Sequence, residues 1–222
     1  MAAKLAACVS AVSNWCAAKR LQLDTNKTEV TWMGSATNFG KLSSAEQHLK
    51  VEPDNVSPTT VVRDLGVFFD SELTMKSHIS RITSACFYQL RRLRTVRGQL
   101  GQEVTDRLVL VFILSRLDYC NAILAGLPTS TLASLQRVIH AAVRVVYDFK
   151  PYDHVTPALK ALHWLPIKQR IEFRLCILVH LAINNKAPVY LQNLLTTTAS
   201  VSLVGHQTAR PATTAALKHG HF

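Results

Sequence analysis

Residues 103–128 form the longest stretch that is apolar around most of a helical turn, and its second half reads SRLDYCNAILAGLP. A helix of this kind is typical of the middle of a hydrophobic core, so we expect one central helix with other helices around it. Gly126 can adopt the left-handed conformation that ends a helix, and Pro128 cannot continue one, so the helix is expected to end there. The apolar pattern places Val104, Leu108, Val111 and Ser115 on one face and Leu110, Phe112, Ile113, Leu114 and Leu117 on the others.

Three polar residues, Arg116, Asp118 and Asn121, interrupt this stretch. A buried charge is costly unless it is paired, so they predict an internal ion pair or a capping network. A catalytic role for Asp118 is the alternative, but no second carboxylate lies within one helical turn of it.

The composition indicates a globular, basic protein. A chain of 222 residues with 48% hydrophobic content can bury a core of its own. Its 25 Lys and Arg against 14 Asp and Glu give a net charge of +11, which favours an anionic partner such as nucleic acid or an acidic membrane face. No apolar run approaches the roughly 18 residues that span a bilayer, so we expect no membrane partner.

The five cysteines are widely spaced and never form a Cys-x-x-Cys pair. Neither a disulfide framework nor a zinc module is indicated, and reduced thiols predict an intracellular protein, nuclear or cytoplasmic. The histidines do not have the spacing of metal ligands, so no metal site is expected.

The order of patterns along the chain predicts an α+β fold. We expect a small α/β piece with short strands in residues 1–70, a mainly helical bundle in residues 71–195, and a poorly ordered tail in residues 196–222. In the first part, the pattern predicts a helix at residues 2–20, short strands at 29–33 and 48–51, a turn at 53–58 and a strand at 61–70 that is bent at Gly66. In the second part, it predicts helices at residues 75–97, 129–146, 158–163 and 167–184.

The helix expected at residues 75–97 carries several cations and no acid. Basic side chains on a helix can follow a phosphate backbone and give salt-sensitive, sequence-independent affinity. A solvated face that keeps the protein soluble is the alternative, and the sequence leaves both open. The only charged residues between Leu73 and Gln102 are Lys76, Arg81, Arg91, Arg92, Arg94 and Arg97.

Three stretches in the same order carry a family resemblance. They are LQLDTNKTEVTWMGS (21–35) with VRDLGVFFDSELTMKSHIS (62–80), SRLDYCNAILAGLP (115–128), and YDHVTPALKALHWLPIKQRIEFR (152–174). Together they resemble the late palm and thumb of reverse transcriptases, the RNA-directed DNA polymerases of LINE-type non-LTR retrotransposons, over about residues 9–195. The resemblance implies a palm remnant in residues 1–70 and a thumb-like domain in residues 71–195.

The resemblance also implies roles for two residues of the palm remnant. Lys27 matches the lysine before the late palm strand, which in the family is thought to help protonate the departing pyrophosphate. A solvated turn lysine is the alternative, and the residues favour it. Residues 65–69 match the primer grip, in which Gly66 would let a backbone approach closely while its neighbours form a buried strand.

Polymerisation needs carboxylates that hold two Mg²⁺ ions, and the chain contains no Asp-Asp pair. The family's aspartate turn lies upstream of the part that resembles residues 9–20, so we expect a fragment without the catalytic aspartates. Such a fragment would be inactive as a polymerase and would have no cofactor of its own, although the intact family enzyme uses Mg²⁺.

The expected partners are an RNA or DNA template-primer, bound weakly, and a further chain that could supply the missing palm. One alternative is a protein–protein interaction module that exposes Val67 and Phe69. The other is a decayed, non-functional retroelement product.

Overall fold

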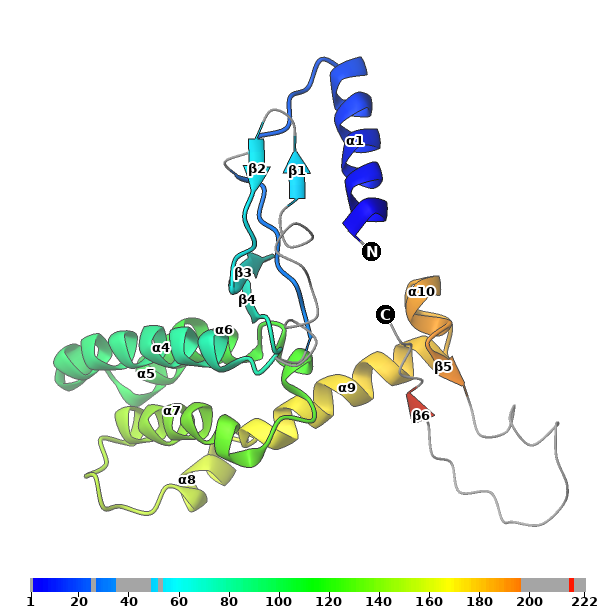
Figure 1. Cartoon of the computed structure of the whole chain (residues 1–222). Coiled ribbons are helices and arrows are strands. Elements are labelled where there is room, and N and C mark those ends of the chain that lie inside the picture. Colours follow the sequence, from blue (N-terminus) through cyan, green and yellow to red (C-terminus); the bar gives the residue numbers. More distant parts are fainter. Residues whose placement is uncertain (1, 25–26, 35–48, 52–53, 197–215, 218–222) are drawn as a thin grey trace, which may run out of the picture.

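A computed structural model describes residues 2–24, 27–34, 49–51, 54–196 and 216–217. The protein has an α+β fold, as expected: a helical bundle with small two-stranded antiparallel sheets. Helix α1 (Ala2–Ala18) lies beside the hairpin of β1 (Leu49–Val51) and β2 (Asp54–Val56), and the chain descends from there to the bundle (Figure 1). None of the described helices combines the length and the apolarity that crossing a membrane requires.

The bundle is built around α4 (Lys76–Val96) and α7 (Thr129–Tyr147), which make its most extensive contact. Between them in sequence, α5 (Gln102–Val109) continues through the π-helix η3 (Leu110–Leu114) into α6 (Ser115–Asp118) and packs on both. The remaining elements are β3 (Val61–Asp64), β4 (Val67–Asp70), η2 (Arg97–Gln99), η4 (Asn121–Leu124), α8 (Thr156–Ala161), α9 (Ile167–Ile183), α10 (Val189–Gln192), β5 (Leu195–Thr196) and β6 (Ala216–Leu217).

One hydrophobic core lies between α4, the α5–η3 helix and α7. The buried residues of α4 and α7 supply most of it, and each fully buried aliphatic side chain contributes about 1.5–3 kcal/mol. The largest fully buried side chains among the described residues are Cys86, Thr105, Val109, Ile113, Leu135, Val138, Ile139, Val143 and Val146.

The N-terminal piece has only a small core of its own, in which Val30 is buried against Ala6, Val9 and Val56. The expected strand at residues 29–33 is wrong: Val30 makes a single parallel bridge with Pro58. Proline has no N–H group to extend a ladder, which accounts for the isolated bridge. Strand β1 agrees with the strand expected at residues 48–51, whereas β2 lies where a turn was expected.

Residues 61–70 form a hairpin and not one bent strand. Strands β3 and β4 pair from Val61 opposite Asp70 to Asp64 opposite Val67. The two residues between them, Leu65 and Gly66, have φ of +44° and +86°, as a two-residue hairpin turn with the matching twist requires.

Phe69 in β4 packs against the main core and Val67 is only 4% exposed. The expectation that these two residues form an exposed interaction face is therefore wrong. The hairpin covers one end of the bundle, and this burial accounts for their apolar character.

The long helix expected at residues 103–128 ends at Asp118. Tyr119 is extended and Cys120 has φ of +52°, so the chain turns before η4. Gly126 does adopt a left-handed conformation, with φ of +79°, but after η4. The helix is also not surrounded, because Val111 is 63% exposed while Ile113 is fully buried.

Two of the three polar residues of this stretch, Asp118 and Asn121, form an internal ion-pair network as expected, whereas Arg116 is exposed and takes no part in it. Arg170 donates from Nη1 to both oxygens of Asp118 at 2.8 and 3.0 Å, and from Nε to the carbonyl of Leu165 at 2.7 Å. The side chains of Arg170 and Asp118 are 13% and 33% exposed. Buried Asn121 adds a longer hydrogen bond to Asp118, at 3.4 Å. This network joins the end of α6 to the start of α9.

The tail expected at residues 196–222 lies mostly outside the described residues. In its described part, Thr196 of β5 lies opposite Ala216 of β6 in an antiparallel pair that also joins Leu195, the last residue before the tail, to Leu217.

We predict that Arg170→Ala lowers the free energy of unfolding by about 1.5–3 kcal/mol, since it leaves the Asp118 carboxylate without its charged donor. Urea denaturation measures this loss. Lys168→Ala is the matched control on α9, because Lys168 and Glu172 are exposed and 3.9 Å apart, and should change stability by less than about 0.5 kcal/mol. Equal effects of the two variants would contradict a structural role for the Asp118–Arg170 pair.

Candidate nucleic-acid interface

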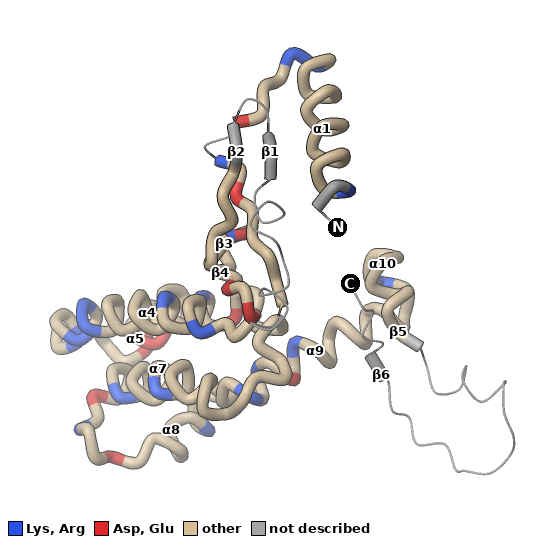
Figure 2. Tube along the Cα trace, viewed as in Figure 1, with Lys and Arg blue, Asp and Glu red and all other residues tan. Residues whose placement is uncertain are grey.

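Helices α4 and α7 carry Lys and Arg side chains but no Asp or Glu along their whole lengths. Figure 2 shows these cations along both helices. The two helices run parallel, because the start of α4 lies beside the start of α7 and the end of α4 beside the end of α7. The groove between them therefore runs between two rows of basic and uncharged side chains.

The first hollow in this groove has a volume of about 490 Å³ and lies between the first halves of both helices. Lys76 and Arg137 provide its charge, and most of its other lining residues carry hydroxyl groups. Hydroxyls and cations are the side chains that bind phosphate oxygens. The hydroxyl-bearing residues are Ser80, Thr83, Ser84, Ser130, Thr131 and Ser134.

The second hollow, of about 240 Å³, lies further along the groove and is bordered by Arg91, Arg94 and Arg144. The Arg144 Nη2 atom is 3.5 Å from the carbonyl of Asp153, and its Nε has no hydrogen-bond partner among the described residues. No described residue that lines either hollow is acidic. The groove therefore offers an uncompensated positive lining.

The structure divides the six cations expected on α4 into different environments. Lys76, Arg91 and Arg94 border the groove. The guanidinium of Arg81 lies 4.2 Å from the ring centroid of Phe68 on β4, and that of Arg92 lies 5.8 Å from the ring of Tyr88 on its own helix. Both remain exposed, and such stacking leaves their charge available.

Arg97 does not line either hollow, because its side chain binds backbone carbonyls. Its guanidinium donates to the carbonyls of Leu100, Val145 and Val146 at 2.7, 2.9 and 2.8 Å. The last two belong to the final turn of α7, whose carbonyls have no partner within the helix. Arg97 thus caps α7 and ties it to the end of α4, which sets the spacing of the groove without lining it.

The cations of α7 were missed as site residues from the sequence. Arg137 and Arg144 lie in the helix expected at residues 129–146, and the structure brings them to the cations of α4. Their seven-residue spacing on a helix without acids was the available signal. Whether these two arginines line a groove depends on which helix lies next to α7. The periodicity of the sequence does not reveal that neighbour.

Neither Lys27 nor Gly66 lines the groove. The Nζ atom of Lys27 is 3.0 Å from Asp24 Oδ2, and its side chain is 85% exposed, which supports a solvated turn lysine. Gly66 lies beside the ring of Tyr119, whose hydroxyl donates to the carbonyl of Leu65 at 2.5 Å. The hairpin turn accounts for a glycine at this position.

Among the residues that the structure describes, no three His, Cys, Asp or Glu side chains gather closely enough to hold a metal ion.

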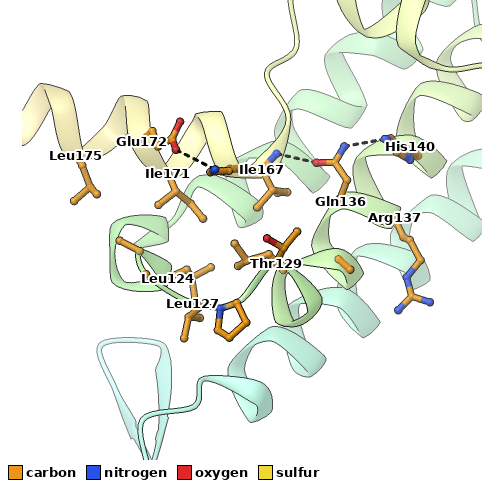
Figure 3. A pocket seen from close by; sticks show the side chains of 16 residues that line it. Leu124, Leu127, Thr129, Gln136, Arg137, His140, Ile167, Ile171, Glu172 and Leu175 are labelled. Atoms are coloured by element: carbon orange, nitrogen blue, oxygen red, sulfur yellow. Dashed lines mark hydrogen bonds and ion pairs between the residues drawn. The ribbon is translucent and has the colours of Figure 1, made fainter.

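An apolar pocket of about 530 Å³ lies between α7, α9 and the segment that joins η4 to α7 (Figure 3). Gln136 of α7 lines this pocket and links α7 to the start of α9. Its Oε1 accepts from the backbone N–H of Ile167, and its Nε2 lies 2.8 Å from His140 Nε2. Since Ile167 N–H can only donate, the Gln136 amide must donate to His140. His140 is therefore neutral, with its proton on Nδ1.

Burial, aided by the nearby charge of Arg144, lowers the pKa of His140, and burial also lowers the pKa of His78. The Nδ1 of His78 accepts from the backbone N–H of Phe68 at 3.4 Å. A lowered pKa in the folded state means that the unfolded state binds protons more readily. The stability from these two residues is present above a pH of about 6.5 and is lost as the pH falls through the lower folded pKa values.

We therefore predict that the free energy of unfolding falls between pH 7 and pH 5. His140→Gln keeps an acceptor for Gln136 and cannot titrate, so its stability should depend less on pH over this range. His163→Gln, at an exposed position, serves as the control and should follow the parent protein. Chemical denaturation at several pH values measures the effect, and identical profiles for both variants would contradict a lowered pKa of His140 in the folded state.

Comparisons with models of protein families, with curated proteins and with solved structures found no match to this chain. The resemblance to reverse transcriptases therefore remains a prediction from the residues that carry it.

Proposed function

We propose that this chain binds the sugar–phosphate backbone of nucleic acid in the groove between α4 and α7. The observation that carries the proposal is the lining of this groove: five cations and six hydroxyl-bearing residues from two packed helices that contain no acid. Phosphate oxygens can accept from all of these groups. The five cations are Lys76, Arg91, Arg94, Arg137 and Arg144.

The lining favours contacts with phosphates over contacts with bases. The cations are spread along the groove, and each phosphate that they neutralise releases counterions. With five such contacts to a duplex, the logarithm of the affinity should fall with the logarithm of the salt concentration at a slope of about −4.5. Affinity should vary little with base sequence, because phosphates carry no sequence information.

Because this chain resembles LINE-type reverse transcriptases, we propose that the nucleic acid it binds is a template-primer. We also propose that its helical domain acts as the thumb of such an enzyme. In this proposal the chain binds the template-primer but does not catalyse polymerisation. It has no Asp-Asp pair, and a polymerase needs carboxylates for its two metal ions. A solvated basic face that serves only solubility is the competing reading. It predicts that the position of the cations is irrelevant and that only their number counts.

We predict that replacing Arg91, Arg94, Arg137 and Arg144 together by Ala weakens binding to a labelled hybrid duplex at least tenfold and reduces the magnitude of the salt slope by about 3.6. Fluorescence anisotropy over a series of salt concentrations measures both. The control replaces Lys4, Lys19, Lys160 and Lys186, four exposed cations outside the groove, so that the net charge is matched. If both variants lose the same amount of affinity and of salt slope, the groove is not the binding site.

We also expect no primer extension by this chain on a primed template with Mg²⁺ and all four nucleotides. Extension that withstands replacement of Asp118 by Asn would point to a contaminating polymerase. Extension that this substitution abolishes would contradict the assignment of Asp118 to a structural ion pair.

A further inference from the structure

The apolar pocket between α7, α9 and the segment that joins η4 to α7 has the size of a small-molecule site. Its volume is about 530 Å³, and pockets that bury most of a small ligand measure roughly 300–1,000 Å³. Such pockets combine an apolar lining with a few polar groups that orient the ligand. The large aliphatic side chains of the lining are Leu124, Leu127, Leu132, Ile167, Ile171 and Leu175.

The polar groups of α7 lie on one side of this pocket. Figure 3 shows Gln136, Arg137 and His140 on that side, whereas Leu124 and Leu175 lie on the other. The first backbone N–H of α9 donates to Gln136, so the start of α9 lies on the same side as these polar groups. The N-terminus of a helix carries a partial positive charge that favours anions.

Arg137 supplies a full positive charge on this side. It is exposed and lines the pocket, and its guanidinium makes no hydrogen bond or ion pair with any residue that the structure describes. The single acid among the described lining residues is Glu172, which lies 3.9 Å from Lys168 and on the far side of the pocket from Arg137 (Figure 3). The pocket thus has a cationic end and an aliphatic end.

This asymmetry distinguishes between classes of ligand. An apolar cation would be repelled by Arg137 and by the start of α9. A polyanion such as nucleic acid would bring phosphates against aliphatic side chains, where they lose hydration without gaining donors. A single carboxylate on an apolar chain satisfies both ends, because the chain covers the aliphatic lining and the carboxylate accepts from a guanidinium.

We propose that this pocket binds the anion of a medium-chain fatty acid. Its carboxylate lies at Arg137 and the start of α9, and its chain runs along α9 toward Ile171 and Leu175. From Ile167 to Leu175 helix α9 advances about 12 Å, which sets the length of chain that the pocket covers. We expect decanoate to bind with a Kd on the order of 100 μM, as suits a ligand of few atoms.

This inference does not rest on nucleic-acid binding. Arg137 also borders the first hollow of the groove, but the other lining residues of the pocket border neither hollow. The tests below use protein freed of nucleic acid by nuclease treatment. Failure of either proposal would therefore leave the other standing.

The first test is calorimetric titration of the full chain with hexanoate, octanoate and decanoate. Each added methylene should tighten binding about fourfold, because it buries more apolar area. Decyltrimethylammonium, which has the same chain with a cationic head, should bind at least tenfold more weakly than decanoate. The proposal is overturned if decanoate does not bind at millimolar concentration, or if the cationic amphiphile binds as tightly.

Two variants with matched controls test the position of the ligand. Ala133 is an exposed lining residue of α7, so Ala133→Phe should fill the pocket without disturbing the core and abolish decanoate binding. The control is Ala17→Phe at an exposed position of α1. Arg137→Gln should weaken binding at least fivefold, whereas Arg174→Gln, at an exposed position outside the pocket, should not.

Circular dichroism and urea denaturation show whether each variant is folded. Decanoate binding that survives in folded Ala133→Phe would mean that the ligand binds elsewhere and would overturn the proposal. Equal effects of the two arginine substitutions would overturn the assignment of the carboxylate to Arg137.

Discussion

The parallel packing of α4 on α7 is the contact on which the rest of the structure depends. Their apolar stripes form the centre of the core, with Cys86, Val138 and Ile139 almost fully buried. At one end Arg97 of the α4 side donates to the last carbonyls of α7. A planar guanidinium fixes its acceptors in position as well as satisfying them. The two helices are thereby held in alignment along their length, and α5–η3, α9 and the β3–β4 hairpin pack around them.

The same contact creates the candidate interface. Once the apolar stripes face each other, the polar sides of both helices border one groove, and the cations of two segments about fifty residues apart become neighbours. Neither helix alone would offer more than a scattered basic face. The cations of α4 illustrate this, because only some of them border the groove, while Arg81 and Arg92 lie over aromatic rings and Arg97 caps a helix. Position within the packed pair decides which of these cations line the groove.

The long helices and their buried stripes were predictable from the sequence, because a 3.6-residue period with polar residues on the other side has one favourable orientation. The sequence predicted that Asp118 would form an internal ion pair but not which residue would pair with it, since Arg170 lies 52 residues away. The hairpin at residues 61–70 was missed because a two-residue turn adds no break in the apolar run. The central helix was misread because a stretch that is apolar on every side does not show which side is covered, and a π-turn shifts the period within it.

Net charge describes this protein less well than the distribution of its charges. At physiological ionic strength exposed charges act over about 8–10 Å, so each surface responds to its own residues and not to the total of +11. The groove between α4 and α7 has cations without acids, whereas on α5 the carboxylate of Glu103 pairs with Arg107. The charge at the surface therefore differs from helix to helix, because α4 and α7 carry cations and no acid, whereas α5 carries Glu103 beside Arg107.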